Sequence, residues 1–362
     1  MGDRQPLPFA EDSVVDQLKR RLVHARKGRL QWIHQDSKVH WGPVLRSVNS
    51  VLVVRRLSDS SFELVELSGT GRRLRRHPVQ YLFSAPVLDP LGRIVLIGLN
   101  GLVQCLTPTF KPVWSSRVHQ PHSSVAFFQN GQLLLGTREG KLLSLSTTGN
   151  VGWRYNLGRT APGAIAMGVG GSFYLCTGSE GSLVKFSAAG KTLWKSTVGG
   201  CTARPLVTPM GSVVVSSAGG LSSFTKDGKI QWRLTLSGKG SAPVAGHRGS
   251  IYLTSTAGLL LSVGSRGRLR WSFPIGPSTE PMDPVIGPQG NVYVASPNGR
   301  LLVVSSAGQL LWHSPVPRPG PQLAVRFDGA VMAIARGDSV RLIAPPKTRR
   351  AVGASITPRS RP

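Results

Sequence analysis

Apolar and polar side chains alternate along most of this chain, in short runs separated by turn-forming residues. Two examples are Ser250–Thr254 and Asn291–Ala295, where every second side chain is apolar. A period of two predicts antiparallel strands with one buried face. Each run follows a short opening segment such as Ala242–Val244 or Asp283–Val285, which we interpret as a further strand.

Glycine recurs at matching places between the runs, where hairpin turns require a positive φ that a Cβ atom disfavours. One series of these turns contains Gly101, Gly140, Gly181, Gly220, Gly258 and Gly299, and another contains Gly149, Gly190, Gly228, Gly267 and Gly308. With 43 glycines and 27 prolines, the composition also favours an all-β protein with many turns.

Each glycine of the second series is the first residue of a Gly-x-x-x-Trp unit, and this unit repeats along the chain. The tryptophans are Trp32, Trp114, Trp153, Trp194, Trp232, Trp271 and Trp312, with Arg75 in the equivalent place of one further unit and Phe110 in the glycine place of the Trp114 unit. Successive positions are about 40 residues apart, the length of one four-stranded propeller blade. The tryptophans are interpreted as blade-packing residues rather than as a ligand-stacking set.

The two ends of the repeat determine the number of blades. Residues 320–344 supply three strands without a fourth, and residues 28–34 supply a tryptophan strand with no blade before it. Pairing these segments would complete an eighth blade and close the ring, which removes the open sheet edges. We therefore predict an all-β, eight-bladed, monomeric propeller over residues 28–344, with an N-terminal extension (1–27) and a basic disordered tail (345–362).

The net charge of +28 is spread over the predicted propeller, where residues 28–344 carry 33 Lys and Arg against 12 Asp and Glu. Such a surface attracts anionic partners, although a general solubility charge is an equal alternative. Two clusters are candidate anion- or partner-binding residues: Arg72, Arg73, Arg75 and Arg76, and Lys347, Arg349 and Arg350. Both could also be solvated edge protection.

Residues 13–26 predict a short basic amphipathic helix. Its apolar stripe could cover the propeller, rest on a membrane surface or enter a partner's groove. No apolar run is long enough for a membrane helix, and acidic and basic residues interrupt the place where a secretory signal would lie.

The sequence predicts no catalytic, metal-binding or cofactor-binding residues. The cysteines Cys105, Cys176 and Cys201 are widely spaced, and their odd number leaves the redox compartment open. His119 and His122 are interpreted as residues of a solvated loop, with a metal pair as the alternative. No hydrolase triad, phosphate loop or dinucleotide motif stands in the required context.

The segments AGKTLW (189–194), DGKIQW (227–232) and AGQLLW (307–312) resemble the pyrroloquinoline-quinone-like propeller repeat. Catalytic members of that superfamily bind the quinone with calcium, an aspartate base and a disulfide between adjacent cysteines. Here no two cysteines adjoin, and only Glu280 and Asp283 are acidic residues near an inner-strand start in the regular blades. The resemblance is therefore to the non-catalytic branch, similar to the lipoprotein scaffold of outer-membrane barrel assembly.

We accordingly predict a non-enzymatic scaffold without a cofactor that binds another protein, with an anionic partner surface favoured. One alternative is a quinoprotein-like oxidoreductase or small-ligand binder that uses the central channel. The other is a binder of nucleic acid or another anionic polymer. The resemblance suggests the cell envelope or periplasm, while the absence of a visible signal peptide keeps the cytoplasm open.

Overall fold

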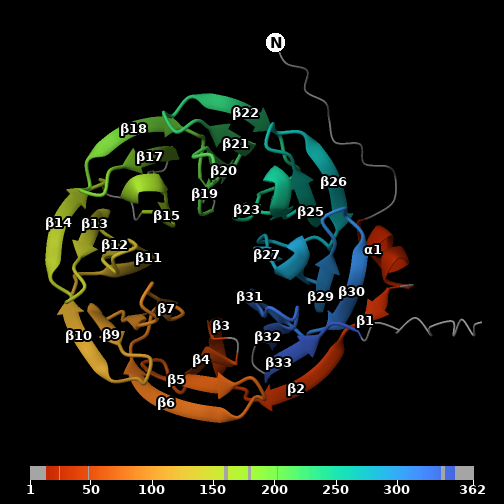
Figure 1. Cartoon of the computed structure of the whole chain (residues 1–362), viewed down its shortest axis with the longest axis horizontal. Coiled ribbons are helices and arrows are strands. Elements are labelled where there is room, and N and C mark those ends of the chain that lie inside the picture. Colours follow the sequence, from red (N-terminus) through yellow and green to blue (C-terminus); the bar gives the residue numbers. More distant parts are fainter. Residues whose placement is uncertain are drawn as a thin grey trace, which may run out of the picture.

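The strands form eight sheets arranged in a ring around a central axis (Figure 1). The computed structural model describes residues 14–23, 25–47, 49–158, 162–177, 181–201, 203–335 and 339–346. Within each blade four antiparallel strands follow one another from the axis outwards, and we letter them A to D. The prediction of an all-β propeller with eight blades is confirmed.

The blades are numbered in chain order, and the bounds of their strands are as follows. Blade 1 contains β3 (Val39–Ser47), β4 (Ser50–Arg56), β5 (Ser61–Ser68) and β6 (Arg73–Gln80). Blade 2 contains β7 (Val87–Leu88), β8 (Ile94–Ile97), β9 (Leu102–Leu106) and β10 (Pro112–Arg117). Blade 3 contains β11 (Pro121–Phe127), β12 (Leu133–Thr137), β13 (Lys141–Leu145) and β14 (Val151–Asn156). Blade 4 contains β15 (Ala166–Met167), β16 (Phe173–Thr177), β17 (Ser182–Phe186) and β18 (Thr192–Thr197).

The second half of the ring has the same organisation. Blade 5 contains β19 (Leu206–Val207), β20 (Val213–Ser217), β21 (Gly220–Phe224) and β22 (Ile230–Leu234). Blade 6 contains β23 (Val244–Ala245), β24 (Ile251–Ser255), β25 (Leu259–Val263) and β26 (Leu269–Pro274). Blade 7 contains β27 (Val285–Ile286), β28 (Val292–Ser296), β29 (Arg300–Val304) and β30 (Leu310–Pro315). Blade 8 contains β31 (Pro319–Val325), β32 (Val331–Ala335), β33 (Ser339–Ala344) and β2 (Arg29–Gln35).

Blade 8 joins the two ends of the propeller. Its three inner strands come from the end of the chain, and β2 pairs antiparallel with β33 from Arg29↔Ala344 to Gln35↔Ser339. Just before β2, the short strand β1 (Arg26–Lys27) lies parallel to β30 of blade 7. The predicted closure by an N-terminal strand is therefore confirmed. Residues 1–13 and 347–362 lie outside the described residues, so the predicted division of the chain at these ends stays a prediction.

The core lies between the blades. Val53 and Val65 of blade 1, for example, pack in one cluster with Met332 and Leu342 of blade 8. The B and C strands are consequently buried on both faces, as in β20, where all five residues are buried. Most of their buried polar positions hold small hydroxyl side chains such as Ser216, while Glu63 and Glu66 of β5 are buried and paired with arginines. The alternating burial expected of half-buried strands appears instead in the D strands, as in β18.

Seven of the eight seams between neighbouring blades are built from the D-strand tryptophan of one blade and a glycine of the next. A Cβ atom on each of these glycines would lie 2.6–2.9 Å from a ring atom of the tryptophan. The pairs are Trp32–Gly71, Trp114–Gly149, Trp153–Gly190, Trp194–Gly228, Trp232–Gly267, Trp271–Gly308 and Trp312–Gly28. Glycine is required there because the ring leaves no space for a side chain. We therefore propose a packing role for these tryptophans.

The eighth seam, between blades 1 and 2, has neither member of the pair. Arg75 stands in the tryptophan place, and Phe110 stands in the glycine place with a positive φ of 69°. Phe110 is buried and packs in a cluster that includes Val79 and Leu82. The large ring can lie there because no tryptophan covers the turn. Both departures from the repeat thus belong to one seam, and we propose that they compensate each other in volume.

The helix α1 (Val14–Val23) packs on the rim of the propeller beside blade 6 (Figure 1). Leu18 is 2% exposed and lies in a cluster with Phe273 and Ile275. The Arg21 guanidinium lies 4.8 Å from the centre of the Phe273 ring, a cation–π contact. The apolar stripe of the helix is therefore in contact with the propeller. Among the described residues, no helix has the length and apolar character needed to cross a membrane.

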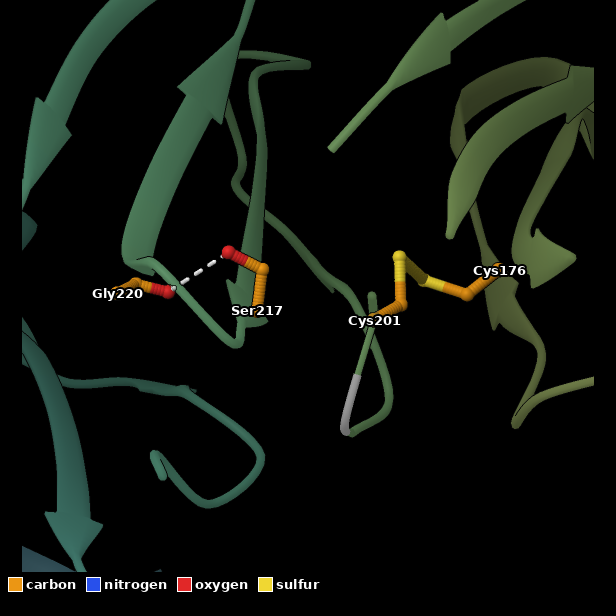
Figure 2. Close-up of a disulfide and its surroundings, with 4 residues drawn as sticks. All are labelled: Cys176, Cys201, Ser217 and Gly220. Carbon is orange, nitrogen blue, oxygen red and sulfur yellow. Dashed lines mark hydrogen bonds between the residues drawn. A yellow bond between two sulfur atoms is a disulfide. The ribbon is translucent and has the colours of Figure 1, made fainter. Parts of the chain in front are cut away.

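A disulfide between Cys176 and Cys201 joins blades 4 and 5 (Figure 2). Cys176 lies in β16, and Cys201 lies in the connection that leads to blade 5, where it forms a β-bridge with Ser217. The Cα atoms of the two cysteines are 5.7 Å apart. The sequence did not predict this bond, because only the fold brings a B strand next to the connection that follows its own blade.

The disulfide makes a count of reactive thiols informative. In unfolded, non-reduced protein we expect alkylation of Cys105 alone, and alkylation of all three cysteines after reduction. In the folded protein Cys105 should stay unreactive at pH 8, because burial raises its thiol pKa to about 11. The double variant Cys176→Ser/Cys201→Ser should lose about 2–4 kcal/mol of unfolding free energy. Mass spectrometry gives the count, and more than one alkylated cysteine without reductant would contradict it.

Candidate functional site

The antiparallel order of the strands divides the turns between two faces of the disc. The turns that join strands A to B and C to D lie on one face, which we call the basic face. Its A–B turns in blades 2 to 8 are 89–93, 128–132, 168–172, 208–212, 246–250, 287–291 and 326–330. Its C–D turns are 69–72, 107–111, 146–150, 187–191, 225–229, 264–268 and 305–309. The B–C turns and the connections between blades lie on the other face, which we call the opposite face.

Cations dominate the basic face. Its turns carry three carboxylates, two of which are paired locally: Arg93 binds Asp89 at 2.6 Å, and Arg326 lies 3.2 Å from Asp328. Eight further cations are exposed: Arg72, Lys111, Lys191, Lys226, Lys229, Arg248, Arg266 and Arg268. The remaining carboxylate is Asp227. This face therefore has a strong positive field, which attracts anions over a range set by the ionic strength.

The opposite face is balanced in charge. Its described turns and connections carry five cations and five carboxylates: Lys38, Arg138, Arg204, Lys239 and Arg318, and Asp36, Asp59, Glu139, Glu280 and Asp283. Lys239 and Glu280 lie 4.0 Å apart, and Asp59 pairs at 2.6 Å with Arg56 at the end of the adjoining strand β4. The excess of positive charge is thus not spread evenly over the two faces.

Exposed apolar side chains stand at four A–B turns of the basic face. They are Leu91, Val169, Met210 and Phe327, and Met210 is 92% exposed. Two of these turns have local structure that presents the side chain: Val169 begins the 3-10 turn η1 (Val169–Gly171), and Leu91 lies in a loop whose backbone N–H groups donate to Asp89. A surface that combines cations with apolar anchors is typical of a protein interface.

The A strands of blades 2 to 6 surround a central cavity of about 560 Å³. Its lining is mainly apolar, and the ionisable side chains in it are Arg204 and the buried Asp89. Near this site Asp283 accepts a hydrogen bond of 3.0 Å from the backbone N–H of Ala242. Loss of hydration among the surrounding protein atoms raises the pKa of Asp283, although the hydrogen bond and the charge of Arg204 oppose this shift.

The two histidines near the start of blade 3 have different partners. His119 lies in the connection, 3.0 Å from Glu139, whereas His122 lies in strand β11 and not in the predicted loop, and its ring bonds the Ser124 hydroxyl at 3.0 Å. Burial, together with the charge of Arg138, lowers the pKa of His122. Over the part of the chain that the structure describes, no three His, Cys, Asp or Glu side chains form a group that could hold a metal ion.

The predicted arginine cluster lies at blade 1, where two of its members meet carboxylates of the same blade. Arg75 binds the buried Glu66 at 2.8 Å, and Arg46 approaches the other oxygen of Glu66 at 2.5 Å. Arg76 lies 3.9 Å from Glu63. Arg72 belongs to the basic face, and Arg73 is exposed on the rim. Lys347, Arg349 and Arg350 lie outside the described residues. A partner-binding role of this cluster stays a prediction.

Residues 179–328 match the family model of the outer membrane protein assembly factor BamB. This match covers fewer than half of the residues and is consistent with the PQQ-like propeller repeat that the sequence resembles. This propeller is also similar to the C-terminal WD40 domain of Sif2, with a TM-score of 0.71, 13% identity and coverage of 89% of this chain and 99% of that domain. It is similar to BamB from Moraxella catarrhalis, with a TM-score of 0.51, 17% identity and coverage of 70% and 79%.

A streptogramin B lyase shares the fold of this propeller as well, with a TM-score of 0.55, 14% identity and coverage of 72% and 95%. No curated protein sequence matches the chain. At these identities the likeness to solved structures shows the fold alone. Because the neighbours include a lyase as well as WD40 and BamB propellers, the fold does not decide whether a member is an enzyme.

Proposed function

We propose that this propeller is a non-enzymatic scaffold that binds another protein through its basic face, and that the partner presents an acidic surface. The observation that carries the proposal is the segregation of charge: cations accumulate on the A–B and C–D turns, while the opposite face is balanced. Charge complementarity steers association and selects the partner. The exposed Met210 and Phe327 supply apolar anchors, which charge alone does not provide.

The family match agrees with this role. The matched model is described as an assembly factor, a protein that acts through other proteins. A rigid ring with closed sheet edges offers a stable surface for such contacts. The distribution of the apolar side chains favours a protein partner over an anionic polymer, because a polymer held by phosphate contacts alone gains little from them.

Charge reversal on one face tests the proposal. The variant Lys111→Glu/Lys191→Glu/Arg268→Glu changes the basic face, and Lys38→Glu/Lys239→Glu/Arg318→Glu makes an equal change on the opposite face. We expect the first variant to lose at least about tenfold of the partner recovered by cross-linking in the native cell, since each reversal replaces an attraction by a repulsion. The second variant should recover the partner as the unchanged protein does. Mass spectrometry quantifies the cross-links.

Three outcomes would contradict the proposal. Equal losses in both variants would show that net charge, and not this face, controls association. Recovery of nucleic acid alone, lost after nuclease treatment, would favour the anionic-polymer alternative. Redox activity of the purified protein with added quinone and calcium would favour the quinoprotein alternative.

A further inference from the structure

A groove of about 710 Å³ lies on the basic face between blades 5 and 6. One wall is the A–B turn of blade 5, with Thr208, Pro209 and Met210, and the other is the A–B turn of blade 6, residues 246–250. Val214 and Ile251 add apolar surface between these walls. The volume lies within the range of sites that hold small ligands or a few residues of a peptide.

The polar groups in this groove are mostly uncharged donors and acceptors. Hydroxyl groups come from Thr208, Ser212, Ser223, Ser250 and Ser265, and an amide comes from Gln231. Such groups can bond the backbone of an extended segment without selecting its side chains. The larger side chains of the lining are His247, Met210 and Arg248, and we assign the specificity to Met210 and Arg248.

Arg248 is held at the rim by the local backbone. It occupies a left-handed conformation with a φ of 53° inside the 3-10 turn η2 (His247–Gly249). Arg270 supports this turn, because its guanidinium donates to the Ser250 hydroxyl at 2.6 Å and to the Arg248 carbonyl at 3.4 Å. The Arg248 side chain stays exposed. Its charge is thus presented from a fixed backbone, which lowers the ordering cost of binding.

The charge around the groove is strongly positive. Arg266 and Arg268 lie in the adjoining C–D turn of blade 6, and Lys226 and Lys229 lie in that of blade 5. Within the described part of the chain, Arg248, Arg266 and Arg268 form no ion pair with a carboxylate, and Asp227 is the one acidic side chain of these turns. Carboxylates of a partner would therefore be attracted without first displacing an internal ion pair.

We propose that the groove between blades 5 and 6 is the seat of an extended acidic segment of the partner protein, with a carboxylate at Arg248 and an apolar side chain against Met210. This inference rests on the proposed function and names the part of the basic face that recognises the partner. Met and Arg are both enriched in the buried centres of protein interfaces, so the two rim residues suit this role.

Other occupants fit the groove less well. Its lining contains no Phe, Tyr or Trp on which a single-stranded base could stack. A lipid surface would meet the protruding tip of Met210 but would not enter a concave site between two blades. The end of the chain, residues 347–362, carries five cations and no carboxylate, so its charge opposes binding here.

Fluorescence anisotropy with a labelled decapeptide tests this seat in the full-length protein. The peptide has a central leucine flanked by glutamates in a glycine–serine background. We expect about tenfold weaker binding in Arg248→Gln and about fivefold weaker binding in Met210→Ser. Glutamine suits the turn, because Gln289 occupies the same position of blade 7 with a φ of 65°. The matched controls Arg154→Gln and Leu99→Ser, on another blade's outer strand and on a B–C turn of the opposite face, should bind as the unchanged protein does.

The peptide chemistry provides a second comparison. Replacing the leucine by serine should weaken binding about as much as Met210→Ser does, and replacing the glutamates by lysines should abolish it. If the peptide binds equally well to all four protein variants of the preceding experiment, the proposed seat is overturned. Competition experiments give a further test. The proposed seat is also overturned if phosphatidylglycerol vesicles or a single-stranded oligonucleotide displace the peptide while their own binding is unchanged in Arg248→Gln and Met210→Ser.

The outcomes also separate this inference from the proposed function. If the charge-reversed basic face loses its cellular partner while Arg248→Gln and Met210→Ser retain it, the scaffold function stands and the seat lies elsewhere on that face. If the charge-reversed face also retains the partner, both proposals fail.

Discussion

Replacing Trp312 with alanine is expected to lower the free energy of unfolding by about 3–5 kcal/mol, the range for a buried aromatic side chain. Trp312 is 5% exposed and is the most deeply buried of the seam tryptophans. Its ring lies against Gly28, and its centre is 6.2 Å from that of the Tyr293 ring, with the two ring planes at 79°. It also lies at the seam where the start of the chain joins its end, so its loss weakens the closure of the ring.

Trp153 is the matched control for this experiment. It occupies the equivalent place in blade 3, but its ring is partly exposed, and its N–H donates to Ala188 at 3.2 Å. Trp153→Ala should therefore cost about half as much, because less apolar surface returns to water. Chemical denaturation followed by fluorescence and circular dichroism measures both values. Equal costs, or a loss below about 1 kcal/mol in Trp312→Ala, would show that the seams do not control stability.

The seam between blades 1 and 2 allows a second test, in which two harmful changes together should do little harm. Phe110→Gly alone is expected to lower the free energy of unfolding by about 2–4 kcal/mol. It leaves a buried cavity, and the only gain is relief of the strain of one non-glycine residue in the left-handed region. Arg75→Trp alone should also destabilise, because its ring would meet Phe110 and because Glu66 loses one of two guanidinium partners. The double variant restores the tryptophan–glycine pair of the other seams.

A double-mutant cycle measures the coupling between these two positions. We expect the double variant to recover most of the summed loss, with a coupling energy of about 1–3 kcal/mol. The reverse changes at two different seams, Trp153→Arg and Gly228→Phe, affect residues that are not paired with each other, so their losses should add without recovery. Additive losses at Arg75 and Phe110 would mean that the two departures from the repeat arose independently and do not compensate in volume.

The fold could be predicted from the sequence because its main signal is periodic. Seven tryptophans at nearly equal spacing identify the blade, and the unpaired segments near residues 28–34 and 320–344 identify the closure. Each of these features depends on residues close in the chain. Arg75 and Phe110 were visible as two separate irregularities, but their relation was not, because they belong to different blades and only the fold places them at one seam.

The candidate site was much less accessible to sequence reasoning. Charge counted along the chain showed an excess over the whole propeller, whereas the asymmetry appears only when turns are assigned to faces. Arg248 and Met210 lie 38 residues apart in turns without a distinctive motif, and they become neighbours because consecutive blades lie side by side. The disulfide between Cys176 and Cys201 could not be predicted from the sequence for the same reason. The arginine cluster at Arg72–Arg76 was conspicuous in the sequence, yet Arg75 is partly neutralised by Glu66.

The placement of charge on the turns also gives the molecule an electric dipole along the axis of the ring. A disc with a uniform surface would approach an anionic partner in any orientation and would have to rotate after collision. Here the field would turn the cationic side toward the proposed acidic partner while the two molecules are still apart, within roughly one Debye length of about 8 Å at physiological salt. We therefore expect most encounters with that partner to begin with the grooved side of the ring facing it.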